Sequence, residues 1–279
     1  MVDPRRADAP TTASLEWDGA PSDLQPLGPA FHARTYLIDS AMRRLQPRRL
    51  LDIGCGRGYV TAIAARHAGS VVAADLARGA AVSTRAALAA HPQADVIVAN
   101  VLEPAWAETC RSRSRTFDTV LLSEVLEHLD DDLAALQACR ELIAEGGSLV
   151  LTVPAGPSLW TEWDDLAGHR RRYTKVELTA KLTVAGFRVR EVVSWGFPLT
   201  GWLAIRGARM RARRAASHEV DGEVPGLIAR ILPVAAPLLK LAARVERWLS
   251  FLDRGAGYVV VAERLPSDQL LGRKVDVAA

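Results

Sequence analysis

Cysteine is scarce in this chain of 279 residues, and the few cysteines lie far apart. The three of them, Cys55, Cys110 and Cys139, are odd in number, and none belongs to a CxxC pair. Neither a disulfide framework nor a zinc site built on paired cysteines fits this pattern. Reduced thiols are the rule in the cytoplasm, so the sequence predicts a cytoplasmic protein.

Long apolar runs and strong net charge are also missing. No stretch reaches the ~20 apolar residues of a membrane-spanning helix, and residues 1–14 lack the apolar core of a secretory signal. The net charge is only +3, which is too small to indicate a nucleic-acid-binding protein. The one basic cluster, Arg206 to Arg214, has no interleaved aromatic stripe, so no nucleic-acid partner is expected.

Hydrophobic periodicity divides the chain into parts. Residues 1–29 are rich in Pro, Ala, Asp and Thr and predict a flexible arm. Residues 30–195 alternate short apolar strands with helices, and 257–265 add a last strand, so these two ranges form the predicted core. Residues 196–256 are much longer than an ordinary connection and predict a helical cap, and 266–279 form a C-terminal tail.

The core pattern predicts a doubly wound α/β fold. Continuous apolar strands separated by helices indicate a sheet covered on both faces. We therefore expect a Rossmann-like, seven-stranded, mostly parallel sheet with the cap inserted before the last strand. A helix expected over Asp131 to Ala144 ends at the pair Gly146-Gly147. The expected strands span 49–53, 70–75, 95–100, 117–123, 148–154, 188–195 and 257–264.

A glycine-rich turn follows the first strand and opens a helix. Gly54, Gly56 and Gly58 allow close backbone approach to a ligand, and the free amides of the helix face that ligand. A dinucleotide-binding loop would read GxGxxG. This loop reads GxGxG and carries Asp52 two residues earlier, which suits the cationic methionine end of S-adenosylmethionine (SAM) better than a pyrophosphate.

Polar residues end the next two strands. Asp75 ends the second strand, where a carboxylate can accept both ribose hydroxyls, although Asp also caps helices. Asn100 and Val101 follow the third strand, where an adenine would rest. Asn100 could bond the exocyclic amine and Val101 could cover a ring face, or Asn100 could simply serve a turn.

Five motifs in series carry a family resemblance: LLDIGCGRG, VVAADLA, VIVANVLEP, FDTVLLSEVLEHLDD and LIAEGGSLVLTVP. Together they resemble class I SAM-dependent methyltransferases, most closely the ubiquinone/menaquinone-biosynthesis-like (type 11/12) branch that acts on small molecules and lipids. The resemblance covers about Phe31 to Ser194. It implies SAM as cofactor, S-adenosylhomocysteine as product, and cofactor contacts from Asp52, Gly54, Cys55, Gly56, Gly58, Tyr59, Asp75, Leu76, Asn100, Val101, Leu102, Ser123 and Glu124. One departure is Asn100, where many relatives have Asp.

The stretch Ser123 to His128 follows the fourth strand, at the sheet edge where open α/β folds bind ligands. Glu124 and His128 are therefore candidate catalytic residues. In some ubiquinone-type O-methyltransferases a similar stretch is linked to a divalent metal, and carboxylates with a His are suitable ligands. The preferred alternative is that Glu127 and His128 pack against and cap the next helix, so no metal is expected.

The segment WTEWDDLAGHRRRYT, Trp160 to Thr174, follows the fifth strand. His169 is the best candidate general base, because the pKa of an unperturbed His suits proton removal near neutral pH. The alternative is that His169 bonds a loop carbonyl while the arginines pair with Asp164 and Asp165. The side chains expected to bind an acceptor are Trp160, Trp163, Arg172 and Tyr173.

These observations predict methyl transfer to a small, apolar metabolite, natural product or lipid-like acceptor, with oxygen favoured over carbon or nitrogen. An inactive SAM-fold scaffold and a C-methyltransferase stay open, and the GxGxG loop with Asp52 disfavours an NAD-dependent oxidoreductase. The amphipathic cap at 196–256 suits a membrane surface and a homo-oligomer interface equally well.

Overall fold

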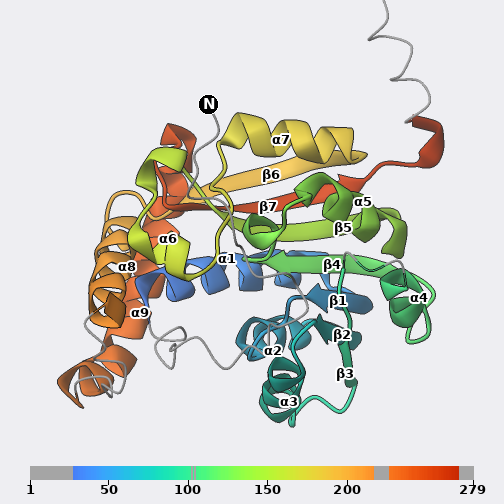
Figure 1. Ribbon diagram of the computed structural model, residues 1–279, viewed down its shortest axis with the longest axis horizontal. Coiled ribbons are helices and arrows are strands. Elements are labelled where there is room, and N and C mark those ends of the chain that lie inside the picture. The colour runs from blue at the N-terminus through green and yellow to red at the C-terminus, as the bar shows by residue number, and fades with distance from the viewer. Residues whose placement is uncertain (1–27, 102, 104, 217–225, 270–279) are drawn as a thin grey trace, which may run out of the picture.

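The computed structural model describes residues 28–101, 103, 105–216 and 226–269. The expected arm up to residue 27, the tail from residue 270 and the predicted adenine contact Leu102 lie outside the described residues. A seven-stranded sheet with the order β3-β2-β1-β4-β5-β7-β6 forms the centre of the molecule (Figure 1). Its strands are β1 (Arg49–Ile53), β2 (Ser70–Asp75), β3 (Ala94–Val98), β4 (Phe117–Ser123), β5 (Ile143–Pro154), β6 (Phe187–Trp195) and β7 (Gly257–Arg264).

The sheet is mixed, and its direction determines where a ligand can bind. Strands β3, β2, β1, β4 and β5 pair in parallel. Strand β7 is antiparallel to both of its neighbours, β5 and β6. All strands except β7 therefore end at the same edge of the sheet, where open α/β folds bind their ligands. The predicted fold class is confirmed.

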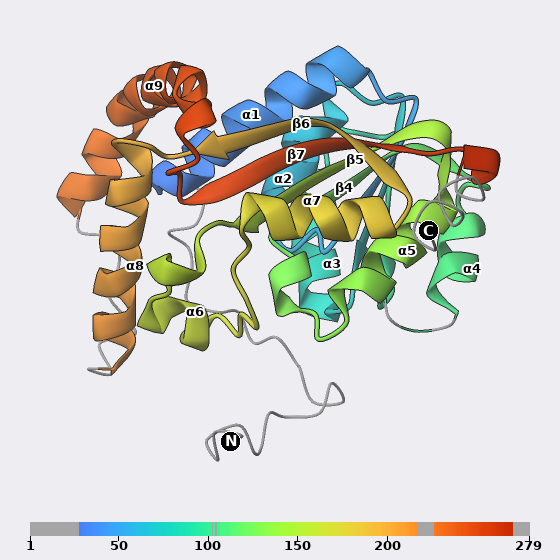
Figure 2. The ribbon, with the colours of Figure 1, turned by 90° about the horizontal axis from the view of Figure 1, so that it is seen from above.

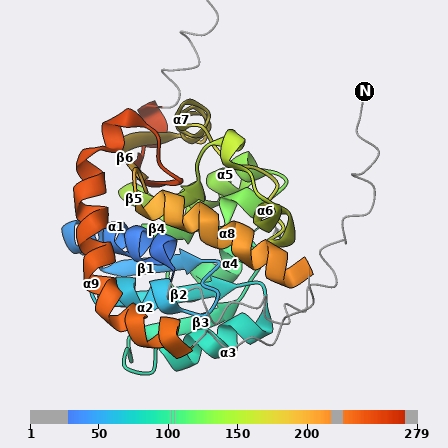
Figure 3. The ribbon, with the colours of Figure 1, turned by 90° about the vertical axis from the view of Figure 1, so that its left-hand side faces the viewer.

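Helices cover both faces of the sheet, as Figures 2 and 3 show. On one face lie α1 (Pro29–Leu45), α2 (Tyr59–Ala65) and α3 (Arg78–Ala87). On the other lie α4 (Trp106–Arg111), α5 (Asp132–Leu142) and α7 (Lys175–Val184). Each layer buries an apolar stripe against the sheet. The inner strands β1, β2, β4 and β7 are almost entirely buried, which explains why they read as continuous apolar runs.

One predicted boundary is wrong. The helix expected to run to Ala144 ends at Leu142, and the glycine pair lies inside β5. The register of β4 and β5 shifts between Phe117 and Thr119, so the strand begins with an irregularity. A Cβ on Gly147 would lie 2.9 Å from the carbonyl oxygen of Asp118. The glycines therefore permit a close strand approach and do not terminate the helix.

Two helices, α8 (Thr200–Ala216) and α9 (Gly226–Trp248), followed by the short turn η6 (Ser250–Leu252), connect β6 to β7. They lie beside α1, at the end of the molecule on the left of Figure 1. The buried Glu246 of α9 accepts hydrogen bonds from the backbone amides of Leu199 (2.8 Å) and Thr200 (2.7 Å), so α9 caps the start of α8. Within the described part of the chain, no helix is long and apolar enough to cross a bilayer.

Candidate functional site

The glycine turn after β1 is a tight cradle. Gly54, Gly56 and Gly58 all have positive φ, at +71°, +54° and +78°, which favours glycine over other residues. A Cβ on Gly54 would lie 2.3 Å from a side-chain carbon of Val125, so the turn touches the segment after β4. The predicted cofactor loop and the predicted catalytic segment therefore lie side by side.

Asp75, at the end of β2, holds this turn in place. One carboxylate oxygen accepts a hydrogen bond from the amide of Gly56 (2.8 Å), and the other accepts one from Ala77 (2.9 Å). Each carboxylate oxygen can accept a second bond, so capacity for two hydroxyls remains. Beside Asp75, Leu76 and Tyr59 expose 46% and 40% of their surface, which leaves apolar side chains available to a ligand.

Asp52 is buried beneath the turn. Its carboxylate accepts a hydrogen bond of 2.5 Å from the hydroxyl of Thr61 on α2. Burial raises the pKa of Asp52 to about 7, opposed by the Thr61 hydrogen bond, while nearby Asp75 raises it further. A cation bound at the turn would reverse this effect, because it would stabilise the ionised carboxylate.

Three further residues predicted to contact the cofactor differ in what they offer. The thiol of Cys55 is buried and lies 3.4 Å from the hydroxyl of Thr84. Val101 is 8% exposed and packs in the core cluster under β3. Asn100 begins the turn after β3, where its carbonyl accepts from the amide of Glu103 (3.0 Å).

Glu124 has the most unusual backbone of the site. Its φ is +56°, which is costly for a residue with a Cβ, and such strain clusters at functional sites. Arg34 of α1 forms an ion pair with it at 3.2 Å, and the hydroxyl of Thr152 donates a hydrogen bond to it at 2.9 Å. The hydroxyl of Ser123 lies 3.1 Å from that of Thr152. Two separate elements, α1 and β5, therefore fix the carboxylate.

The segment after β5 is built around Asp164, which is fully buried. It lies in the short helix α6 (Glu162–Leu166) and accepts hydrogen bonds from the backbone amide of Thr161 (2.7 Å), from Nδ1 of His169 (2.8 Å) and from Arg172 (2.9 Å). Burial alone would raise the pKa of Asp164, but the hydrogen bonds from His169 and Arg172 outweigh burial and hold it well below its usual value. An ionised Asp164 favours a proton on Nδ1 of His169 and leaves Nε2 able to accept one.

His169 meets the segment after β4. Its ring lies edge-on to that of His128, with the centroids 4.8 Å apart. Together with Glu127, the two histidines bring three potential metal ligands within 4.8 Å of one another, one imidazole nitrogen from each histidine and one carboxylate oxygen. Burial lowers the pKa of His128 to about 4, helped by His169, whereas burial and then Glu124 raise the pKa of Glu127 well above its usual value.

Glu127 is fully buried, and neither of its carboxylate oxygens has a hydrogen-bond partner among the described residues. It is the middle residue of η4 (Leu126–His128), and the expectation that it caps the next helix is wrong: Asp131 caps α5 by accepting from the amide of Ala134 (2.9 Å). Orphaned carboxylate oxygens beside two imidazoles fit the donor set of a divalent cation.

The four predicted acceptor-binding side chains separate into two pairs. Trp160 is 36% exposed and donates a hydrogen bond to Asp165 of α6 (3.2 Å), whereas Trp163 faces α8, where the guanidinium of Arg211 lies 4.6 Å from its ring. Tyr173 is fully buried and donates to Asp132 at 2.9 Å, while Arg172 is 8% exposed and bonded to Asp164. For Tyr173 and Arg172 the predicted acceptor contact is corrected: they hold the loop, because their polar groups are already bonded inside it.

Sequence reasoning missed residues that act across long separations. Arg34 lies 90 positions before its partner Glu124, and no local sequence pattern predicts an ion pair over that separation. Thr152 could have been found, since it is a polar residue near the carboxyl end of a buried strand. The sequence pattern indicated Asp164 only as a partner of the arginines. Its hydrogen bond with His169 depends on how the loop folds.

Comparisons with known proteins agree with this geometry. Residues 30–192 match the family described as Methyltransferase domain. The ubiquinone biosynthesis O-methyltransferase of Xanthomonas axonopodis pv. citri is 33% identical over 220 residues, covering 73% of this chain and 84% of the relative. The protein of the same name from Paracidovorax citrulli is 34% identical over 147 residues, covering 52% of this chain and 60% of that relative's length.

Two solved structures share the fold. N-methyltransferase NodS from Bradyrhizobium japonicum WM9 aligns with a TM-score of 0.52 and 15% identity, covering 88% of this chain and 99% of NodS. The [4+2]-cyclase SpnF aligns with a TM-score of 0.54 and 16% identity, covering 84% and 81%. The family match over more than half of the chain and the glycine cradle with Asp75 lead to one conclusion: this chain belongs to the class I SAM-dependent methyltransferases.

Proposed function

We propose that this protein transfers the methyl group of SAM to an oxygen of a small, apolar acceptor. The observation that carries this proposal is the Asp164–His169 pair at the carboxyl edge of the sheet, beside the glycine cradle. The relatives named ubiquinone biosynthesis O-methyltransferase support oxygen as the methylated atom and an apolar acceptor. Trp160, which is 36% exposed, is an apolar side chain that could contact such an acceptor.

The chain's own residues would bind and orient the reactants. Gly54, Gly56 and Asp52 hold the methionine end of the cofactor, and Asp75 holds its ribose. When bound, SAM supplies a methyl group that is already activated on a sulfonium. Alignment and exclusion of water are then the main tasks of the protein, and they contribute about 7 kcal/mol or more to catalysis.

His169 would remove the acceptor's proton. Asp164 would keep Nδ1 protonated, so Nε2 would take the proton of the acceptor hydroxyl as its oxygen receives the methyl group that SAM supplies. His169 then carries the proton, and S-adenosylhomocysteine and the methyl ether are the products. Glu124, held by Arg34 and Thr152, presents a fixed negative charge near the sulfonium position.

The test is methyl transfer from labelled SAM to a panel of hydroxyl, amine and activated-carbon acceptors. We expect label on hydroxyl acceptors, and we expect His169→Ala to lower kcat about 10²–10⁴-fold without changing the affinity for S-adenosylhomocysteine. His91→Ala, on the turn after α3, is the matched control. An undiminished rate in His169→Ala would remove His169 as the base, and cofactor binding without turnover on any acceptor would favour the scaffold.

The Glu127–His128–His169 cluster supports a second candidate for the same step. These residues would hold a divalent cation, which would lower the pKa of the acceptor hydroxyl. Under the base mechanism, a chelator leaves activity intact. The cation is favoured if the chelator removes the activity of the parent protein and a divalent metal restores it. The activity of Glu127→Gln should then not respond to the metal.

A further inference from the structure

The outer face of α9 carries large apolar side chains that nothing in the described structure covers. Leu238, Leu241, Val245 and Trp248 expose 65%, 57%, 57% and 82% of their surface. Their spacing of three, four and three residues aligns them on one side of the helix. Phe251, 73% exposed in η6, extends the same apolar character beyond the helix. We call these five residues the α9 stripe.

The helix packs on the protein through its smaller and more polar side. Ala243 and Glu246 are each 3% exposed, Ala243 against α1 and β6, and Glu246 at the start of α8. Among the described side chains of α9, the four large apolar ones of the stripe therefore point away from the core. Contiguous exposed apolar residues on a folded protein mark interaction surfaces.

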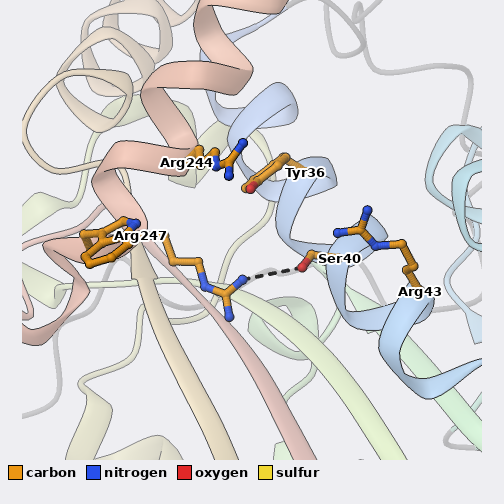
Figure 4. A pocket seen from close by; sticks show the side chains of 6 residues that line it. Tyr36, Ser40, Arg43, Arg244 and Arg247 are labelled. Carbon is orange, nitrogen blue, oxygen red and sulfur yellow. Dashed lines mark hydrogen bonds between the residues drawn. The ribbon is translucent and has the colours of Figure 1, made fainter.

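A cationic hollow of about 690 Å³ adjoins the stripe, at the seam between α1 and α9 (Figure 4). Its lining comprises Tyr36, Ser40, Arg43, Arg244, Arg247 and Trp248. Arg247 pairs with Glu191 at 2.7 Å, whereas Arg43 and Arg244 form no ion pair with any described residue. Trp248 belongs to both the hollow and the stripe, so the two features form one surface.

We propose that this surface docks on an anionic phospholipid bilayer, with the α9 stripe in the interfacial layer and Arg43 and Arg244 against headgroup phosphates. An apolar helix face flanked by cations is the pattern of helices that lie in a membrane interface. Uncompensated arginines beside it match the negative potential of anionic lipids. A two-fold contact with a second copy would use the same cationic patch on both chains, which opposes like charges.

Docking here would hold the candidate site near the bilayer. Helix α8 packs on α6, where Trp163 stacks with Arg211, and α9 packs on α1, whose Arg34 pairs with Glu124. The membrane contact does not depend on the proposed acceptor, because vesicle binding is measured without SAM or turnover.

The experiment is vesicle flotation of the full chain with two lipid compositions. One set of vesicles is phosphatidylcholine alone, and the other holds equal parts of phosphatidylcholine and phosphatidylglycerol. We expect flotation only with the anionic vesicles and weaker flotation as salt is raised. Equal flotation with both compositions, or none with either, would overturn the proposal.

Paired variants test the two halves of the surface. Since each basic side chain contributes about fivefold to binding at an anionic membrane, Arg43→Ala with Arg244→Ala should weaken it about thirtyfold. The matched control is Arg48→Ala, which removes an exposed arginine between α1 and β1 that does not line the hollow.

Val245→Glu with Leu241→Glu should abolish flotation, because it places two negative charges in the stripe. Val176→Glu with Val184→Glu, on the exposed face of α7, is the matched control and should float as the parent does. Loss of flotation in both pairs would overturn the proposal. So would light scattering that shows a dimer which Val245→Glu dissociates, since the stripe would then be an interface between copies.

Discussion

Binding of S-adenosylhomocysteine should be linked to ionisation of Asp52. In the free protein, burial raises the pKa of Asp52 to about 7. The ligand's ammonium group favours the ionised carboxylate, so below pH 7 binding must release a proton. The affinity therefore rises with pH up to about 7 and levels off above it, which is the direction expected for a ligand that lowers a raised pKa.

The size of the effect follows from the pKa. With a free-state value near 7 and a bound-state value near that of an ordinary carboxyl, Kd should fall about tenfold between pH 6 and pH 8. Calorimetry in two buffers with different ionisation enthalpies counts the protons, and we expect about 0.9 released at pH 6 and about 0.1 at pH 8.

Asp52→Asn is the control, because the amide can still accept the hydroxyl of Thr61 but cannot titrate. The linkage should disappear in this variant. A Kd that does not change with pH in the parent protein, or a slope that persists in Asp52→Asn, would refute the role given to Asp52.

Three further variants test the framework of the site. A Cβ on Gly58 would lie 2.8 Å from the backbone of α3, whereas one on Gly56 would meet nothing within 4 Å. Scanning fluorimetry should therefore give a Tm that is about 4–10 °C lower for Gly58→Ala and a clearly smaller change for Gly56→Ala. Tyr173→Phe removes a buried hydrogen bond and should cost about 1–2 kcal/mol of unfolding free energy. Its KM for the acceptor should not change, and a raised KM would restore Tyr173 as an acceptor contact.

The sheet could be predicted because its signals are local. Apolar runs such as 49–53 and 257–264 and the glycine turn each depend on a few neighbouring residues, and the observed strands have those bounds. The fifth strand was placed too late, because a glycine pair has the same appearance at a strand irregularity and at a helix end. The direction of β7 has no local signal, since it depends on its pairing partners.

The site was predictable where it lies on the sheet edge and less so in the loops. Asp75 and Glu124 could be assigned to the edge from strand ends alone. Whether Tyr173 faces a ligand or the core could not, because it depends on Asp132, which lies 41 positions away. The amphipathic pattern of α9 was also visible, but the side that faces outward depends on how Glu246 meets α8.

The most direct test of the central claim is calorimetric titration of the purified chain with S-adenosylhomocysteine, with NADH as the control ligand. We predict micromolar binding of the first and none of the second. Asp75→Asn should weaken binding about 10–100-fold, since a hydrogen bond to a charged group contributes about 1.5–3 kcal/mol. Asp95→Asn, on the neighbouring strand, should not. Binding of NADH, or an affinity for S-adenosylhomocysteine that is unchanged in Asp75→Asn, would contradict the account.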